Sequence, residues 1–235
     1  MKKLALLLVI SVAFLSCHYR TVTGSGNIIT EKRTAGSFSG LTASNDINVE
    51  VKGGAETLVE VQADDNIMQY VETHVSGGTL HVGLKENVNL SNASIKVTVT
   101  VPGLKRLEAN SSASIKLTDV LKNDGMIKMD ASSSGDIEGE VDAPSVSVDV
   151  NSGSRVKLSG KTRDLKVDAS SGSSADVHDL LCESADVDAS SGASASVQAS
   201  VSLKADASSG GTIRYTGQAS VKSNTNSGGS VERKD

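Results

Sequence analysis

The residues of this 235-residue chain that are suited to catalysis are its carboxylates, its many serines and four histidines. Hydrolysis or elimination on a glycan needs two carboxylates, or a carboxylate beside a Lys or Arg, gathered in a cleft. Here the carboxylates recur at intervals instead of clustering, and no serine lies in a Gly-x-Ser-x-Gly segment ahead of a helix. The sequence therefore predicts no catalytic residues, and a glycan-active enzyme is the third of three functional hypotheses.

Metal ligation is the other chemistry that the residue types allow. His74 and His81 are seven residues apart and can meet across a turn, yet no Asp, Glu or Cys lies at a supporting spacing. Asp186 and Asp188 are the best candidates for a cation, but the glycine pattern of calcium-binding repeats is missing. We therefore expect exposed histidines, a solvated acidic patch, no metal and no cofactor.

The first residues have the pattern of a sorting signal. Two lysines precede an apolar run from Leu4 to Leu15, which is shorter than the roughly 20 residues that a membrane-spanning helix needs. Cys17, which follows this run, resembles the lipobox cysteine of bacterial lipoproteins, although Phe14 stands where that pattern usually has Leu. We expect a signal peptide over 1–16, lipid attachment at Cys17 and a tether over 17–27. Secretion with an unpaired cysteine is the alternative.

Charge and composition restrict which partners the protein can bind and which residues can form its core. Removal of residues 1–16 takes away two lysines and changes the net charge from −5 to −7, which disfavours nucleic acid as a partner. An acylated Cys17 leaves Cys182 as the sole other cysteine, so we expect a small buried residue there and no disulfide. Aromatic residues make up only 2% of the chain, so its core must be built from small side chains in a repetitive arrangement.

The most informative pattern is a repeated phrase. Asp-Ala-Ser-Ser-Gly occurs at 168–172, 188–192 and 206–210, and looser copies bring the number to seven. The copies begin at residues 108, 130, 149, 168, 188, 206 and 224, which are 22, 19, 19, 20, 18 and 18 residues apart. A unit near 19 residues without a helical period fits one coil of a β-helix, in which Gly and Ser corners join short strands. The sequence therefore predicts an all-β fold, a parallel β-helix (β-solenoid) with coils of about 19 residues.

Stacked coils would align the equivalent residues of each repeat into columns. Because side chains alternate along a strand, the Ala/Val position of the phrase and the position two residues before it are expected to face inward. The serine two residues after the Ala/Val position would share that side as an internal hydroxyl ladder; this column is Ser111, Ser133, Ser152, Ser171, Ser191, Ser209 and Ser227. The acidic first position would face outward beside a mainly basic column, so that ion pairs neutralise most of its charge.

The N-terminal part is less regular than the rest. Residues 28–101 carry strand-like alternation, with Gly53-Gly54 and Gly77-Gly78 as expected turns, whereas 102–235 contain the regular repeat. The stretch 65–74 fits a short helix and an extended segment equally well. Residues 28–101 are therefore either the first coils of one continuous solenoid or a β-rich portion fused to it.

Several short motifs follow one another in an order that resembles a known family. They are Gly24-Ser-Gly-Asn27, Phe38-Ser-Gly-Leu41, Ala63-Asp-Asp-Asn-Ile67, Val101-Pro-Gly-Leu104 and then the repeats. Over about residues 28–230, the chain is similar to the putative auto-transporter adhesin, head GIN domain family. The resemblance implies a right-handed parallel β-helix on secreted or lipid-anchored envelope proteins of Gram-negative bacteria. It brings no catalytic or ligand-binding residues with it.

The first functional hypothesis is a lipid-anchored binding module of the cell envelope, an adhesin that presents a repetitive polar face. The outward stripe expected to contact a polysaccharide or protein ligand is Asn110, Ser132, Asn151, Ser170, Ser190, Ser208 and Asn226. The lipid at Cys17 would make the membrane a partner and place the protein at the outer membrane or cell surface, with the periplasmic side still open. The second hypothesis is an envelope protein that self-associates into homo-oligomers and has no dedicated ligand.

Overall fold

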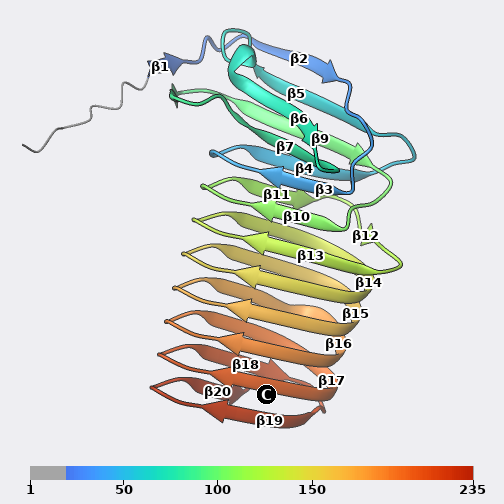
Figure 1. The fold of residues 1–235 in the computed structure, drawn as a ribbon, viewed down its shortest axis with the longest axis vertical. Coiled ribbons are helices and arrows are strands. Elements are labelled where there is room, and N and C mark those ends of the chain that lie inside the picture. Colours follow the sequence, from blue (N-terminus) through green and yellow to red (C-terminus); the bar gives the residue numbers. More distant parts are fainter. Residues whose placement is uncertain (1–19, 235) are drawn as a thin grey trace, which may run out of the picture.

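The structure, a computed structural model, describes residues 20–234, so the expected signal peptide over 1–16 and Cys17 lie outside the described residues. The regular elements of this range are strands and one 3-10 turn, η1 (Met68–Tyr70). Eighteen strands form one continuous sheet, which winds into a right-handed parallel β-solenoid of about seven turns with coils of about 19 residues (Figure 1). The predicted fold class is confirmed.

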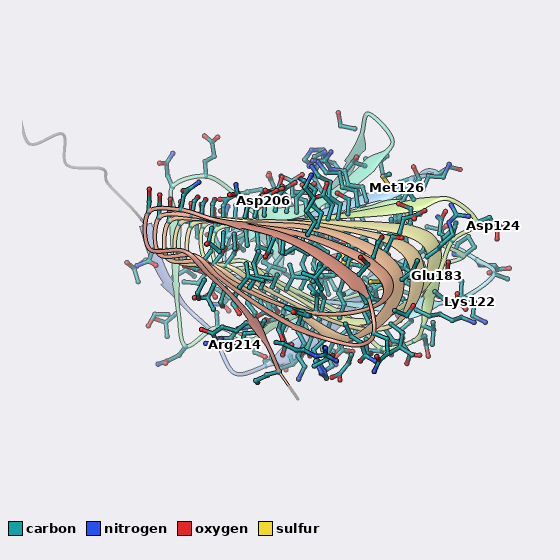
Figure 2. All side chains as sticks on the ribbon, turned by 90° about the horizontal axis from the view of Figure 1, so that it is seen from below. Lys122, Asp124, Met126, Glu183, Asp206 and Arg214 are labelled. Atoms are coloured by element: carbon teal, nitrogen blue, oxygen red, sulfur yellow. The ribbon has the colours of Figure 1, made fainter. Side chains whose placement is uncertain are left out.

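Each regular coil is flattened, with two broad faces joined by a tight turn at one edge and a wide bend at the other (Figure 2). The aspartate face, as we name it, contains β3 (Gly40–Ala43), β10 (Arg106–Ala109), β13 (Met126–Ala131) and β19 (Ser220–Thr225). The opposite face contains β4 (Asn48–Gly53), β11 (Ser114–Leu117), β18 (Thr212–Thr216) and β20 (Ser230–Arg233). Four long strands run from the opposite face round the wide bend onto the aspartate face: β14 (Asp136–Val150), β15 (Arg155–Ala169), β16 (Ser174–Ala189) and β17 (Ser194–Ala207). The short β12 (Leu121–Lys122) lies at the same bend.

Successive coils pair in register, so like residues stack into columns. Val148 pairs with Val167 and Val167 with Val187, and all three are fully buried between the two faces. Full burial of a valine side chain stabilises the fold by roughly 1.5–3 kcal/mol relative to exposure. The next inward column, which includes Ala169 and Ala189, holds small residues because the two faces converge toward the tight turn. The predicted inward position of both columns is confirmed in every copy except the last, whose residues are exposed.

The repeated Ser-Gly phrase forms the tight turn. In one copy the backbone N–H of Ala193 donates to the carbonyl oxygen of Ser190 (3.0 Å), and Ser191 and Gly192 have φ of 53° and 73°. Two consecutive left-handed residues closed by this hydrogen bond define a type I′ turn. All seven serines of the predicted ladder have positive φ.

The prediction that these seven serines face inward is wrong, since all of them are exposed. Side-chain alternation stops at the turn, because two left-handed residues reverse the chain and both project into solvent. The buried hydroxyls at this edge belong to Ser154 and Ser173, each 2% exposed. Their Oγ atoms donate to the carbonyl oxygens of Ala131 (2.7 Å) and Val150 (2.9 Å) in the preceding coil.

Neighbouring turns are also joined to one another. The N–H of Gly172 donates to the carbonyl oxygen of Ser191 (3.0 Å), and the N–H of Gly192 donates to that of Ser209 (3.1 Å). Ser171, Ser191 and Ser209 therefore succeed one another along the solenoid axis, as the predicted columns require. The ladder of backbone hydrogen bonds thus continues from the faces through the tight turn.

The N-terminal region is an excursion from the first coil. β3 pairs with β10 and β4 with β11, so residues 40–53 form the coil directly above the regular repeats. The chain then leaves to form β5 (Leu58–Asp64), η1, β6 (Val71–Ser76), β7 (Thr79–Leu84), β8 (Val88–Ser91) and β9 (Ile95–Val101), and it returns at β10. β5 pairs antiparallel with β9 and with β2 (Ile28–Arg33), and β6 pairs antiparallel with β7. β1 (Arg20–Thr23) pairs with β8 in a separate two-stranded sheet.

The structure resolves two points that the sequence left unsettled. Within the stretch 65–74, η1 is followed directly by the start of β6, so both the helical and the extended alternatives are realised in part. The first coil also contains an eighth copy of the turn, in which Asn45 and Asp46 have φ of 62° and 57° and the N–H of Asp46 donates to Ser111 (2.9 Å). The excursion over 54–105 separates this copy from the others and hides the period.

Replacement of Ser171 and Ser191 by Asn tests the type I′ turn. Asn tolerates the left-handed region better than Ser, so we expect each change to stabilise the protein by about 0.5 kcal/mol. Ser191→Val should destabilise it by about 1–3 kcal/mol, because a β-branched residue is strained at positive φ. Thermal unfolding followed by circular dichroism measures both effects. If the Asn variants lost as much stability as Ser191→Val, the result would support a buried position for these serines and contradict the exposed turn.

Candidate binding face

Three columns of polar side chains lie side by side on the aspartate face. The first lies next to the tight turn and is the predicted interaction stripe. The second is acidic and consists of Glu108, Asp130, Asp149, Asp168, Asp188 and Asp206, with Asn224 in the last coil. The third is mainly basic and consists of Arg106, Lys128, Ser147, Lys166, Asp186, Lys204 and Lys222. Adjacent members of a column are about 4.8 Å apart, the spacing of neighbouring strands.

The structure brings all seven residues of the predicted stripe together. Six of them are half-buried and Asn226 is exposed. The backbone N–H of each donates to the coil before it, as Asn110 does to Ala43 (3.0 Å) and Ser170 to Val150 (2.9 Å). The stripe is therefore a rigid row of short amide and hydroxyl groups beside the acidic column.

Ion pairs between the two charged columns neutralise most of the acidic charge, as predicted. Lys166 Nζ lies 2.8 Å from Asp168 Oδ2, and Arg106 Nη2 lies 2.9 Å from Asp130 Oδ2. Lys204 Nζ binds two carboxylates, Asp206 at 2.9 Å and Asp186 at 3.0 Å. Because the lysine and arginine partners are exposed, each pair contributes about 1 kcal/mol or less to stability. Their main effect is to offset the repulsion that stacking would otherwise impose on the acids.

The negative charge of the acidic column is compensated least at Asp186, where the basic column itself contains an acid. Asp188 lies beside Asp186, and burial raises the pKa of Asp188 above its ordinary value; Lys204 opposes this and the neighbouring aspartates add to it. Oxygens of Asp186, Asp188 and Asp206 lie within 4.8 Å of one another. Lys204 already binds two of these three carboxylates, so the arrangement is an ion-pair network. The structure thus places Asp186 and Asp188, the cation candidates of the sequence analysis, in this network.

The opposite face distributes charge in another way. Its central column alternates in sign from coil to coil and consists of Glu50, Lys116, Glu138, Lys157, Asp176, Ser196, Arg214 and Glu232. Lys116 Nζ lies 2.6 Å from Glu138 Oε1, and hydrogen bonding to Glu138 raises the pKa of Lys116. Each charge in this column thus has an opposite charge in a neighbouring coil. Sequence analysis missed this pattern, because it appears only when the residues after each turn are aligned.

Cys182 is buried, as the sequence predicts, whereas of the histidines in residues 20–234 only His74 is exposed, and His81 and His178 are half-buried. His74 and His81 face each other across the β6–β7 hairpin, with ring centroids 5.1 Å apart and planes 18° from parallel. The ligand atoms of these two rings belong to no group of three or more candidate metal ligands in residues 20–234. Cys182 is buried and its thiol donates to the carbonyl oxygen of Gln198 (3.1 Å). Burial raises the pKa of this thiol to about 11.

A groove lies at the N-terminal end of the molecule, between β2 and β6. Its volume is about 920 Å³, and its lining includes Glu31, Arg33, Met68 and Val71. The Arg33 guanidinium spans the groove, since it donates to the carbonyl oxygen of Val71 (2.7 Å) and lies 3.3 Å from Glu31 Oε1. Arg33 and Glu31 are thus paired with each other in the groove. The aspartate face of the solenoid is flat in the end-on view (Figure 2).

The sequence matches the family described as putative auto-transporter adhesin, head GIN domain, over residues 37–219. The chain belongs to this family. The resemblance noted in the sequence is therefore confirmed. Among curated proteins, the search finds no match.

Solved structures share the solenoid of this head GIN domain protein at low sequence identity. A putative adhesin from Bacteroides fragilis NCTC 9343 is 17% identical, with a TM-score of 0.83 over 90% of this chain and 99% of that chain. A putative lipid binding protein from Parabacteroides distasonis ATCC 8503 is 19% identical, with a TM-score of 0.75 over 92% and 100%. A putative adhesin from Parabacteroides merdae ATCC 43184 is 19% identical, with a TM-score of 0.71 over 92% and 99%. At such identities, the likeness establishes the fold alone.

Family membership supports a broad functional class. The head GIN domain family is described as a putative adhesin family, which points to the cell surface or envelope. It is not a known enzyme family. Within residues 20–234, no helix has the length and apolar character needed to cross a membrane.

Two substitutions in one column test the electrostatic description of the aspartate face. Asp188 has a raised pKa, whereas the hydrogen bond from Lys204 holds the pKa of Asp206 below its ordinary value. At pH 7 the charge on Asp188 therefore costs stability and the charge on Asp206 adds to it. We expect Asp188→Asn to raise the melting temperature at pH 7 and Asp206→Asn to lower it.

The pH dependence supplies the control for this matched pair. Both differences should shrink as the pH falls, because protonation removes the charge that each mutation removes. The raised pKa of Asp188 places its change above the ordinary aspartate pKa of about 4, and the lowered pKa of Asp206 places its change below about 4. Thermal unfolding at a series of pH values measures them. The same sign for both variants at pH 7 would contradict the assignment.

Proposed function

We propose that this protein is a lipid-anchored binding module of the cell envelope, an adhesin that presents its aspartate face to a surface ligand. The carrying observation is that three polar columns repeat on one flat face, once per coil, beside a rigid backbone. Unlike the opposite face, this face keeps like charges in one column, a costly arrangement that stacking alone does not favour. We assign the binding role to it for that reason.

The repetition favours a ligand that is itself extended and repetitive. Each coil offers the same short amide, hydroxyl, carboxylate and ammonium groups at a spacing of about 4.8 Å. When the ligand also has a repeating structure, many weak contacts of this kind combine into strong binding. The reason is that a ligand unit bound at one coil holds the next ligand unit close to the next coil. A polysaccharide or the surface of another envelope protein fits this description. A polyanion such as nucleic acid does not, given a net charge of −5 and the acidic column.

The anchor in this proposal is an acyl-modified Cys17, which holds the protein at the outer membrane. In this arrangement the described residues are exposed either outside the cell or toward the periplasm. Catalysis has no part in the proposal, because the carboxylates of the aspartate face are paired with lysine and arginine on an open surface.

Bulky substitutions on the two faces separate binding from general surface effects. We expect Ser170→Tyr with Ser190→Tyr to weaken binding about tenfold, equivalent to about 1.4 kcal/mol, because the rings cover the stripe. The control is Ser174→Tyr with Ser194→Tyr, which places the same change in the same coils on the opposite face. Binding of labelled protein to whole cells and to extracted surface polysaccharide is the measurement. Equal effects of the two pairs, or no effect of the first, would show that the aspartate face is not the adhesive one.

A further inference from the structure

The N-terminal end of the solenoid carries an exposed strand, β2, that begins with two isoleucines. Every residue of β2 except Arg33 is exposed, and Ile28 and Ile29 are 49% and 40% exposed. Successive residues of a strand point to opposite sides, so the exposure of both isoleucines means that both sides of β2 reach solvent at the start of the strand. β2 also pairs only with β5 among the described strands, which leaves its outer edge free. This strand forms the outermost edge of that end of the molecule (Figure 1).

A clamp ties the chain to this same end just before β2. The N–H of Gly26 donates to Asp64 Oδ1 (2.6 Å), and Asp64 is 1% exposed. Ser25 Oγ and Asn27 Nδ2 donate to the two oxygens of Asp65 at 2.6 and 2.9 Å. The clamp joins two of the family motifs, and it fixes residues of the segment that the sequence predicts as a tether.

The glycine that opens the clamp is sterically required. A Cβ at Gly24 would lie 2.5 Å from the carbonyl oxygen of Asn92 and 2.7 Å from Asp64 Oδ2. No side chain fits there without displacing the backbone. Together with the pairing of β1 and β8, the clamp holds residues 20–27 against the excursion strands.

The distance from the expected lipid to the start of β1 is short. Cys17 precedes Arg20, the first residue of β1, by three peptide units, which span at most about 11 Å when fully extended. β1 and β2 lie at one end of the solenoid, and β19 and β20 lie at the other (Figure 1). An acyl group on Cys17 therefore holds the N-terminal end, and not a broad face, close to the bilayer.

We infer that the N-terminal end of the solenoid is a membrane-contact surface, with Ile28 and Ile29 inserted at the interface of the bilayer that carries the Cys17 lipid. This inference rests on the anchoring in the proposed function and adds the orientation of the rod. Aliphatic side chains next to an acyl anchor gain stability by burial at this interface. Lys32 is paired with Glu60 (3.7 Å) and Arg33 with Glu31 (3.3 Å), so the contact is apolar and needs no anionic lipid. The broad faces then project sideways from an upright rod and remain free for a ligand.

Tryptophan reporters test this orientation directly, because the chain contains no Trp. The chain from Cys17 onward is coupled through Cys17 to a maleimide lipid in phosphatidylcholine vesicles. Cys182 is buried and its thiol has a pKa of about 11, so it does not compete in the coupling. Ile28→Trp places the reporter on β2, and Val201→Trp, at a site that is 59% exposed several coils away, is the matched control.

The readout is quenching by lipids that carry bromine on their acyl chains. We expect strong quenching and a shift to shorter emission wavelength for Ile28→Trp, and neither effect for Val201→Trp. Ile29→Trp is a second reporter on the same strand, and the circular dichroism spectrum of each variant confirms folding. Quenching of both β2 and control reporters would mean that the rod lies flat, and quenching of none would mean that this end stays in water. Either result overturns the inference.

Lipid attachment in cells is tested separately. Cys17→Ser should release the protein from the membrane fraction, whereas Cys182→Ser should leave it there. Release of neither variant would contradict the anchoring in the proposed function. The quenching experiment would still report the orientation of the chemically anchored solenoid on the bilayer. A failure of lipid anchoring in cells is therefore distinguishable from a failure of β2 to contact the membrane.

Discussion

The in-register stacking of coils is the constraint on which the rest of this structure depends. Each coil adds its backbone hydrogen bonds directly beneath the last, and the ladder runs without a break through the tight turn, where Gly192 donates to Ser209. This turn requires two left-handed residues and brings the two faces so close that Ala169 and Ala189 fill the space. The chain can therefore build a core with almost no aromatic residues, because small side chains recur at every level of the stack.

Stacking also determines how polar and charged residues are distributed over the two broad faces. It converts any residue type that recurs in the repeat into a continuous column, and like charges in a column repel. The opposite face avoids this cost by alternation, as in Glu50, Lys116 and Glu138, which follow one another in register. The aspartate face keeps its acids together and offsets them with a separate basic column. A repetitive, charge-balanced but chemically uniform surface is the consequence, and it suits recognition of another regular surface.

The repeat period made the solenoid, the two inward columns and the charge compensation predictable, because all three follow from strand alternation and stacking. Alternation fails where the backbone becomes left-handed, so the exposure of Ser171 and Ser191 could not be read from the pattern of apolar residues. The N-terminal excursion was hidden for another reason: its antiparallel partners lie far apart in sequence, as Ile29 and Ala63 do. The predicted stripe lies in one column, as expected, but its ligand depends on chemistry outside this chain.

Distances between spin labels along one column test the stacking most directly. With both native cysteines replaced by Ser, one label at Asn110 is paired in turn with a label at Ser190, Ser208 or Asn226. These residues lie four, five and six coils from Asn110, so separations of about 19, 24 and 29 Å are predicted, with a constant increment of about 4.8 Å per coil. Separations that fail to grow by a constant step would contradict the stacked solenoid and, with it, the face to which binding is assigned.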